Sequence, residues 1–113
     1  MDTQQTLSAL AALAQESRLA IFRSLVVAGG AGMTPGALSE TLSLAPPTLS
    51  FHLKELMQAG LLRKRQDGRF IHYEANFAAM NDVIAYLTEN CCQGEHCEVD
   101  ASLCRESESG ACQ

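Results

Sequence analysis

The sequence predicts a mainly helical fold with one β-hairpin, and three observations lead to this prediction. Apolar residues recur at helical spacing in several separate stretches of the 113-residue chain. Two short stretches flank Asp67-Gly68, a dipeptide typical of tight hairpin turns. Hydrophobic residues make up 47% of the chain, which suffices for a globular core, and no apolar run is long enough to span a bilayer. We expect the order helix-helix-helix-helix-strand-strand-helix.

Two helices are expected at the start of the chain. Residues 4–14 carry leucines and alanines at helical spacing, which predicts a short amphipathic helix. A second helix is expected over residues 18–28, with Glu16-Ser17 as its cap. It should end at the glycine-rich run 29–32, because three glycines in four residues do not sustain a helix.

The third and fourth helices are expected to form a helix-turn-helix. Thr34-Pro35 is typical of a helix start, and the short helix should cover residues 35–42. Residues 43–45 form a tight connection, so the next helix must cross at a steep angle.

The fourth helix should begin at Pro46-Pro47, since prolines are tolerated in a first turn. It should end just before Gly60, because glycine suits the position after a helix end. Its inward stripe is expected to be Leu49, Leu53, Leu56 and Met57. The side chains expected on its other faces are Thr48, Ser50, Phe51, His52 and Lys54.

A basic hairpin follows this helix. Residues 62–66 and 69–74 flank Asp67-Gly68, which favours a two-residue type I′ turn. The hairpin has few residues to bury, so we interpret it as a protruding wing. Residues 77–89 then predict a last helix that packs either on a partner chain or on the core of its own chain.

This order of elements favours DNA binding by a winged helix-turn-helix. Small polar groups near the start of the fourth helix suit base edges in the major groove. The residues assigned to DNA are Thr48, Ser50 and His52 for base contacts and Lys54, Arg63, Arg65 and Arg69 for phosphates. Capping of the helix start would explain Thr48 and Ser50, and a solvated hairpin would explain the basic residues of the wing. DNA binding explains all of these residues together better than the two separate causes do. The net charge of −5 argues weakly against DNA, but the basic residues are clustered and part of the acid lies after residue 90.

All five cysteines lie between positions 91 and 112. An odd number in a chain without a secretory leader argues against a disulfide framework and favours the cytoplasm. Cys91, Cys92 and Cys97 can converge if the backbone turns at Gly94, and three thiolates suit a soft, thiophilic ion. Zinc or cadmium with His96, redox-active thiols and thiols without a ligand remain alternatives. A further alternative is that the protein sequesters metal or is a small oxidoreductase. The sequence contains no Cys-x-x-Cys motif and no nucleophile-base pair, so we expect that it is not an enzyme.

Several of these runs resemble the ArsR/SmtB family of metalloregulatory repressors. They are LSFHLKEL at residues 49–56, AGLL at 59–62, RQDGR at 65–69 and Tyr73. Residues 16–22 (ESRLAIF) are similar to the family's second-helix start, with Glu-Ser where Asp-Pro or Ser-Pro is usual. The resemblance covers roughly residues 5–97. It implies a homodimer joined through the first and last helices, bound to double-stranded operator DNA before a resistance operon until a ligand releases it.

The resemblance also suggests the ligand. The family's third-helix arsenic motif would fall at residues 38–44, which hold no cysteine, and Asp82 lacks the histidines of the zinc pattern. LTENCC at residues 87–92, with a third cysteine a few residues on, is similar to arsenic repressors with a three-sulfur site at the C-terminal end. Cys91, Cys92 and Cys97 would then bind trivalent arsenic or antimony as inducer, with no organic cofactor.

These expectations divide the chain into two parts. Residues 1–90 should form the DNA-binding and dimerisation domain. Residues 91–113 should form an acidic, cysteine-rich tail with the metalloid-binding loop at 91–97.

Overall fold

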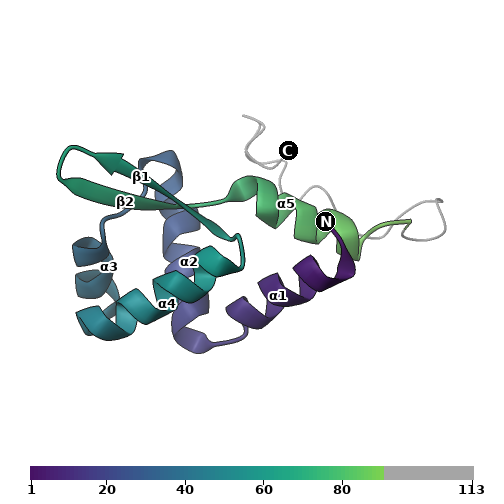
Figure 1. The fold of residues 1–113 in the computed structure, drawn as a ribbon, viewed down its shortest axis with the longest axis horizontal. Helices are drawn as coiled ribbons and strands as arrows, with labels where there is room; N and C mark the ends of the chain where they lie inside the picture. Colours follow the sequence, from purple (N-terminus) through teal and green to yellow (C-terminus); the bar gives the residue numbers. More distant parts are fainter. Residues whose placement is uncertain (91–113) are drawn as a thin grey trace.

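The structure is a computed structural model that describes residues 1–90 and confirms the expected winged helix-turn-helix. The elements are α1 (Thr3–Leu13), α2 (Glu16–Ala28), the 3₁₀ turn η1 (Gly29–Ala31), α3 (Pro35–Leu42), α4 (Pro46–Gln58), β1 (Leu62–Asp67), β2 (Phe70–Ala75) and α5 (Phe77–Leu87). Helices α2, α3 and α4 make one body, from which the hairpin extends (Figure 1). Helices α1 and α5 lie side by side at the other end (Figure 1).

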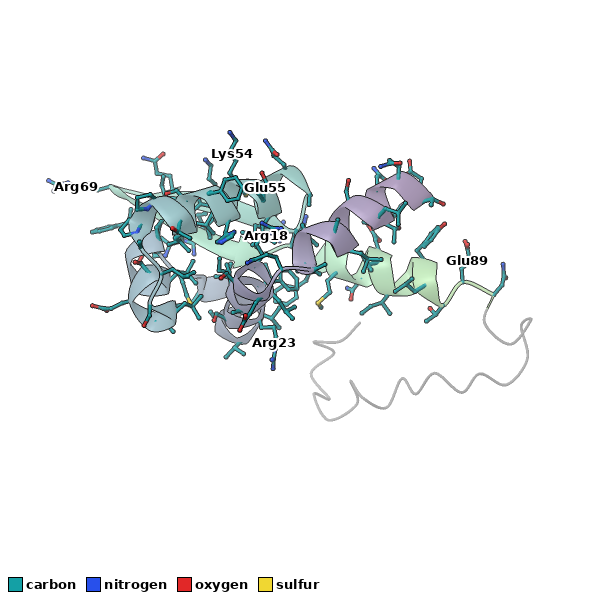
Figure 2. All side chains as sticks on the ribbon, turned by 90° about the horizontal axis from the view of Figure 1, so that it is seen from below. Arg18, Arg23, Lys54, Glu55, Arg69 and Glu89 are labelled. Atoms are coloured by element: carbon teal, nitrogen blue, oxygen red, sulfur yellow. The ribbon has the colours of Figure 1, made fainter. Side chains whose placement is uncertain are left out.

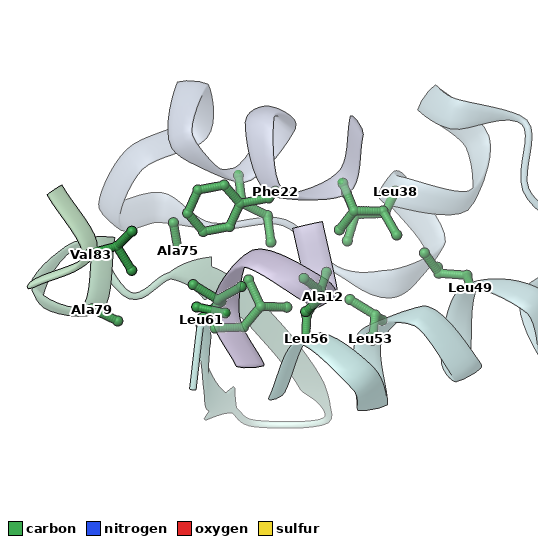
Figure 3. Close-up of a cluster of buried hydrophobic side chains, with 14 residues drawn as sticks. Ala12, Phe22, Leu38, Leu49, Leu53, Leu56, Leu61, Ala75, Ala79 and Val83 are labelled. Atoms are coloured by element: carbon green, nitrogen blue, oxygen red, sulfur yellow. The ribbon is translucent and has the colours of Figure 1, made fainter. Parts of the chain in front are cut away.

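One hydrophobic core joins these elements. Leu49, Leu53 and Leu56 of α4 are each at most 3% exposed. They meet α2, α3 and the start of β1 in the cluster that Figure 3 shows, while Ala79 and Val83 of α5 lie toward its edge. Burial of several large apolar side chains, each worth about 1.5–3 kcal/mol, therefore holds α4 in place.

The helix starts follow local capping rules. Asp2 and Gln5 form a reciprocal capping box at the start of α1. The side chain of Gln15 caps α2 by accepting a hydrogen bond of 2.9 Å from the Arg18 amide. The predicted cap at Glu16-Ser17 is therefore wrong, because Glu16 already lies in the first turn, where its charge suits the helix dipole.

The connection between α3 and α4 is short and well defined. Thr34 caps α3 by accepting from the Ala37 amide at 3.2 Å, as the sequence predicted. Ser43 ends the helix in the left-handed conformation, with φ of 56°. The hydroxyl of Ser39 donates to the Leu44 carbonyl, which fixes the turn into α4.

The hairpin turn differs from the prediction by one residue. Asp67 pairs with Phe70, so the two loop residues are Gly68 and Arg69 rather than Asp67 and Gly68. Gly68 has φ of 66°, and Arg69 is not among the positive-φ residues. A positive φ at the first loop position alone is the type II′ pattern rather than the predicted type I′.

A short backbone bridge anchors the wing to the body. Met33 and Tyr73 exchange two backbone hydrogen bonds of 2.9 and 2.8 Å. Gly32 precedes this bridge with φ of 66° and ψ of −170°, a region that essentially only glycine adopts. A Cβ at position 32 would lie 2.5 Å from the carbonyl oxygen of Tyr73. The wing can therefore lie this close to the body only because position 32 is glycine.

Within residues 1–90, no helix combines the length and apolar character that a membrane crossing requires.

We predict that Gly32→Ala destabilises the fold more than Gly29→Ala does. Gly29 has a similar backbone conformation, φ 68° and ψ −148°, but open space around its Cβ position. Gly29→Ala should therefore cost only the backbone strain, about 1–3 kcal/mol, whereas Gly32→Ala adds the clash with Tyr73. Urea denaturation measures both, and hydrogen exchange at Met33 and Tyr73 reports the bridge.

Gly36→Ala serves as a control with an effect of the opposite sign, because this position is helical and has open space around its Cβ position. It should stabilise the protein by about 0.5–1 kcal/mol. Equal losses in Gly29→Ala and Gly32→Ala would contradict the role assigned to Gly32.

Candidate nucleic-acid interface

The outer face of α4 carries the small polar and basic groups. Thr48, Ser50 and Lys54 are exposed, as expected from the sequence. No side chain caps the start of this helix, where two prolines occupy the first turn. Pro46 and Pro47 have no amide hydrogen, and the Leu49 amide donates to the Ala45 carbonyl oxygen. The Thr48 amide is therefore the donor of this turn that has no intrahelical partner and is available to an acceptor outside the helix.

His52 is placed differently from the prediction. It is 8% exposed and lies among the buried residues of α4. Position 52 is three residues after Leu49 and four before Leu56, so it belongs to the inward stripe of the helix. The prediction that His52 faces outward, toward base edges, is therefore wrong.

Arg18 explains why a histidine is accepted at this buried position. Its Nε donates to the Ala12 carbonyl oxygen at 2.7 Å, and its Nη1 lies 3.3 Å from Nδ1 of His52. A guanidinium can only donate, so Nδ1 accepts and the ring proton sits on Nε2. Arg18, at the start of α2, therefore links the end of α1 to α4.

The pKa of His52 is lowered from its ordinary value of 6.5. Burial is the largest cause, because it penalises the charged imidazolium, and the positive charge of Arg18 acts in the same direction. Glu55 opposes both and raises the pKa. The ring is consequently neutral at pH 7, the state that can accept from Arg18.

The wing carries more internal charge pairing than the sequence indicated. Glu74 lies 3.9 Å from Arg63 and 3.6 Å from Arg65 in nitrogen–oxygen distance. Arg65 also donates to the carbonyl oxygens of Gly30 and Ala31 in η1, at 3.4 and 3.1 Å. Arg63 and Arg65 are therefore less available to phosphates than predicted. This pairing follows from the observed register, which places Arg63 opposite Glu74.

Other cations are free of such pairing. Within residues 1–90, Lys54, Lys64 and Arg69 have no carboxylate within ion-pair distance. Lys54 projects from the face of α4, and Arg69 lies at the tip of the hairpin (Figure 2). Arg23 projects from the opposite face of the molecule (Figure 2). The positive charge available to a phosphate backbone thus includes α4 and the tip of the wing.

A second exposed surface is apolar. Exposed large hydrophobic side chains on α1 and α5 are Leu7, Leu10, Ile84 and Leu87, each at least 38% exposed. The hydroxyls of Thr3 and Tyr86 form a hydrogen bond that ties α1 to α5. Helices α1 and α5 lie side by side at the end of the molecule away from the wing (Figure 1).

The predicted thiol site, Cys91, Cys92 and Cys97, lies outside the residues that the structure describes. Among residues 1–90, no three His, Cys, Asp or Glu side chains gather as a metal site would require.

Comparisons with known proteins agree with this fold. A family model described as a helix-turn-helix domain matches residues 13–65. The chain is 32% identical over 75 residues to the arsenical resistance operon repressor of Staphylococcus aureus, covering 66% of this chain and 67% of that protein. An ArsR-like transcriptional regulator from Rhodococcus sp. RHA1 has a similar structure, with a TM-score of 0.71 and 28% identity over 80% of this chain and 82% of that one.

A third relative is the transcriptional repressor SdpR of Bacillus subtilis (strain 168). It is 33% identical over 58 residues, which are 51% of this chain. The match spans 64% of SdpR, less than two thirds of its length. These relatives regulate transcription and are not enzymes, in line with the expectation from the sequence.

We predict that His52 makes the fold sensitive to mild acid. The unfolded chain takes up a proton here near pH 6.5, whereas the folded chain does so only at lower pH. The stability contributed by the neutral ring is therefore complete above pH 6.5 and falls as the pH drops below it. His52→Asn, whose amide oxygen can replace Nδ1 as acceptor, should lose less stability between pH 7.5 and pH 5 than wild type in urea denaturation. Equal losses in the two proteins would contradict this.

Proposed function

Because this chain belongs to the ArsR family of winged helix-turn-helix transcriptional regulators, we propose that it represses transcription from operator DNA and that a trivalent arsenical or antimonial releases it. The observation that carries the DNA-binding part of this proposal is the outer face of α4, where Thr48, Ser50 and an unpaired Lys54 are exposed. Such a regulator acts in the cytoplasm, where the DNA lies.

In this proposal α4 enters the major groove. The groove, about 12 Å wide, admits one α-helix. Thr48 and Ser50 near its start contact base edges, and Lys54 and Arg69 contact phosphates. Arg63 and Arg65 contribute to phosphate binding by exchanging Glu74 for phosphate. This exchange is easiest for Arg63, whose side chain is 63% exposed and 3.9 Å from Glu74.

The apolar surface of α1 and α5 suits a second copy of the chain. Contiguous exposed apolar side chains at one end of a small domain indicate an interface. A two-fold pair joined there carries two copies of α4 and matches an operator with two half-sites. We therefore propose a homodimer formed through α1 and α5, with residues 1–90 as its DNA-binding and dimerisation domain.

The inducer site is proposed at Cys91, Cys92 and Cys97, in the tail of residues 91–113. Three thiolates are suitable ligands for a soft ion, and the relative from Staphylococcus aureus is named for arsenical resistance. The positions of these cysteines directly after α5 suggest how binding acts on DNA. Helix α5 is tied to α1 through Tyr86 and Thr3, and Arg18 links the end of α1 to His52 in α4.

A ligand that favours one arrangement of α5 would therefore shift α4 through these contacts. It can do so only through unequal affinity for two conformers of the dimer. A coupling free energy of about 1–3 kcal/mol corresponds to a roughly 5- to 150-fold loss of DNA affinity.

We predict that sodium arsenite weakens DNA binding of the wild-type chain about 5- to 150-fold. The probe is a duplex that the wild-type protein selects from a random-sequence pool, and binding is followed by fluorescence anisotropy. Cys91→Ser, Cys92→Ser and Cys97→Ser should each abolish the response, because each removes one of three ligands. Cys104→Ser and Cys112→Ser are matched controls in the same tail and should respond like wild type.

Three other results would each change the proposal. A normal response in all three variants excludes this ligand set. Release by zinc or cadmium but not arsenite, with loss in His96→Ala, favours a zinc-type site. Release by peroxide but not by arsenite favours a redox sensor.

A further inference from the structure

Phe51 is the one large apolar side chain on the outer face of α4. It is 56% exposed. Thr48 precedes it by three residues and Lys54 follows it by three, and both are exposed. Residues three apart on a helix are neighbours on one face, so the phenyl ring lies between a small polar group and a free cation.

Neither the core nor the apolar interface surface accounts for this ring. The buried stripe of α4 is formed by Leu49, His52, Leu53 and Leu56. The exposed hydrophobic residues of the proposed interface lie on α1 and α5, whereas Phe51 lies in the first half of α4. Figure 1 shows the first half of α4 beside α3, at the end of the molecule away from α1 and α5. The ring therefore belongs to the surface proposed to bind DNA.

The ring is held by its neighbours. Its centroid is 5.6 Å from that of His52, at an interplanar angle of 61°, an edge-to-face arrangement. His52 is itself fixed by burial and by Arg18. Phe51 is therefore presented in a defined orientation and loses little rotamer freedom when it meets a partner.

The chemistry of the major groove offers one apolar partner. Base edges there present hydrogen-bond donors and acceptors, which a phenyl ring cannot satisfy, and the C5-methyl group of thymine. We infer that Phe51 is a specificity-determining residue that contacts the methyl group of a thymine in each half-site of the operator. The surrounding charge fits this partner, because Lys54 can hold the adjacent phosphate while the ring reads the base.

This inference rests on the proposed binding of DNA by α4 and extends it to one base. It predicts that a thymine is required at one position of each half-site for a reason other than hydrogen bonding. Uracil tests this directly, because it presents the same hydrogen-bonding edge as thymine and lacks only the methyl group.

The experiment starts from the duplex that the full wild-type chain selects from a random-sequence pool. Each thymine is then replaced in turn by deoxyuridine, at symmetric positions in the two half-sites, and Kd is measured by fluorescence anisotropy. We expect one symmetric replacement to raise Kd about fourfold for each half-site, the value of one methyl group removed from water. The same replacement should have no effect on Phe51→Ala.

Two variants control the experiment. Phe51→Ala should fold normally, since the side chain is largely exposed, and its thermal unfolding is compared with wild type. Phe70→Ala removes another exposed phenylalanine, 63% exposed and in the wing. It should keep the full uracil effect whatever its own affinity for DNA, because it leaves the ring on α4 intact.

The possible outcomes separate this inference from the proposed function. If no deoxyuridine replacement weakens wild-type binding, or if the effect persists in Phe51→Ala, the assignment of Phe51 is wrong while DNA binding stands. If the wild-type chain selects no sequence from the pool, the proposed function fails and the inference fails with it.

Discussion

The burial of one face of α4 is the constraint on which the rest of the structure depends. Leu49, Leu53 and Leu56 fill the core beneath the helix, and this burial determines which residues remain outside. Rotating α4 to expose a different face would remove these leucines from the core, at a cost of several kcal/mol. The exposed positions 48, 50, 51 and 54 are thus fixed by packing rather than by the ligand. A reading surface that is set before DNA arrives loses little conformational entropy on binding.

Two polar contacts connect this helix and the wing to the rest of the domain. Arg18 holds the end of α1 and the ring of His52 together, so a shift of α1 reaches α4 directly. The bridge between Met33 and Tyr73 fixes the base of the wing and requires Gly32. Together with the hydrogen bond between Thr3 and Tyr86, the Arg18 contacts form a chain of contacts from α5 to α4, along which we propose that a ligand acts on DNA binding. The coupling free energy between ligand and DNA is then set by how differently the two conformers of the proposed dimer bind the ligand.

Much of the fold follows from local sequence signals. The glycine run after α2, Thr34-Pro35 and Gly60 each set a helix boundary that the structure confirms. The prediction for His52 is wrong because histidine is a polar residue type, whereas position 52 continues the buried stripe of positions 49, 53 and 56. The hairpin turn shifted because Gly68 takes the first loop position, which depends on the register of the whole strand pair. Glu74 could be paired with the wing arginines only once this register was known. The cysteine site stays a prediction, since residues 91–113 lie outside the described part of the chain.

We propose that DNA lies against α4 and the tip of the wing rather than against another basic part of the surface. The salt dependence of Kd tests this most directly, because each phosphate contact contributes about 0.9 to the slope of log K against log salt. Lys54→Gln and Arg69→Gln should each reduce the slope by about 2, because the proposed dimer loses one phosphate contact in each half-site. Arg23→Gln, which removes the same charge from the opposite face, should leave it unchanged (Figure 2). A reduction with Arg23→Gln and none with Lys54→Gln or Arg69→Gln would contradict the account.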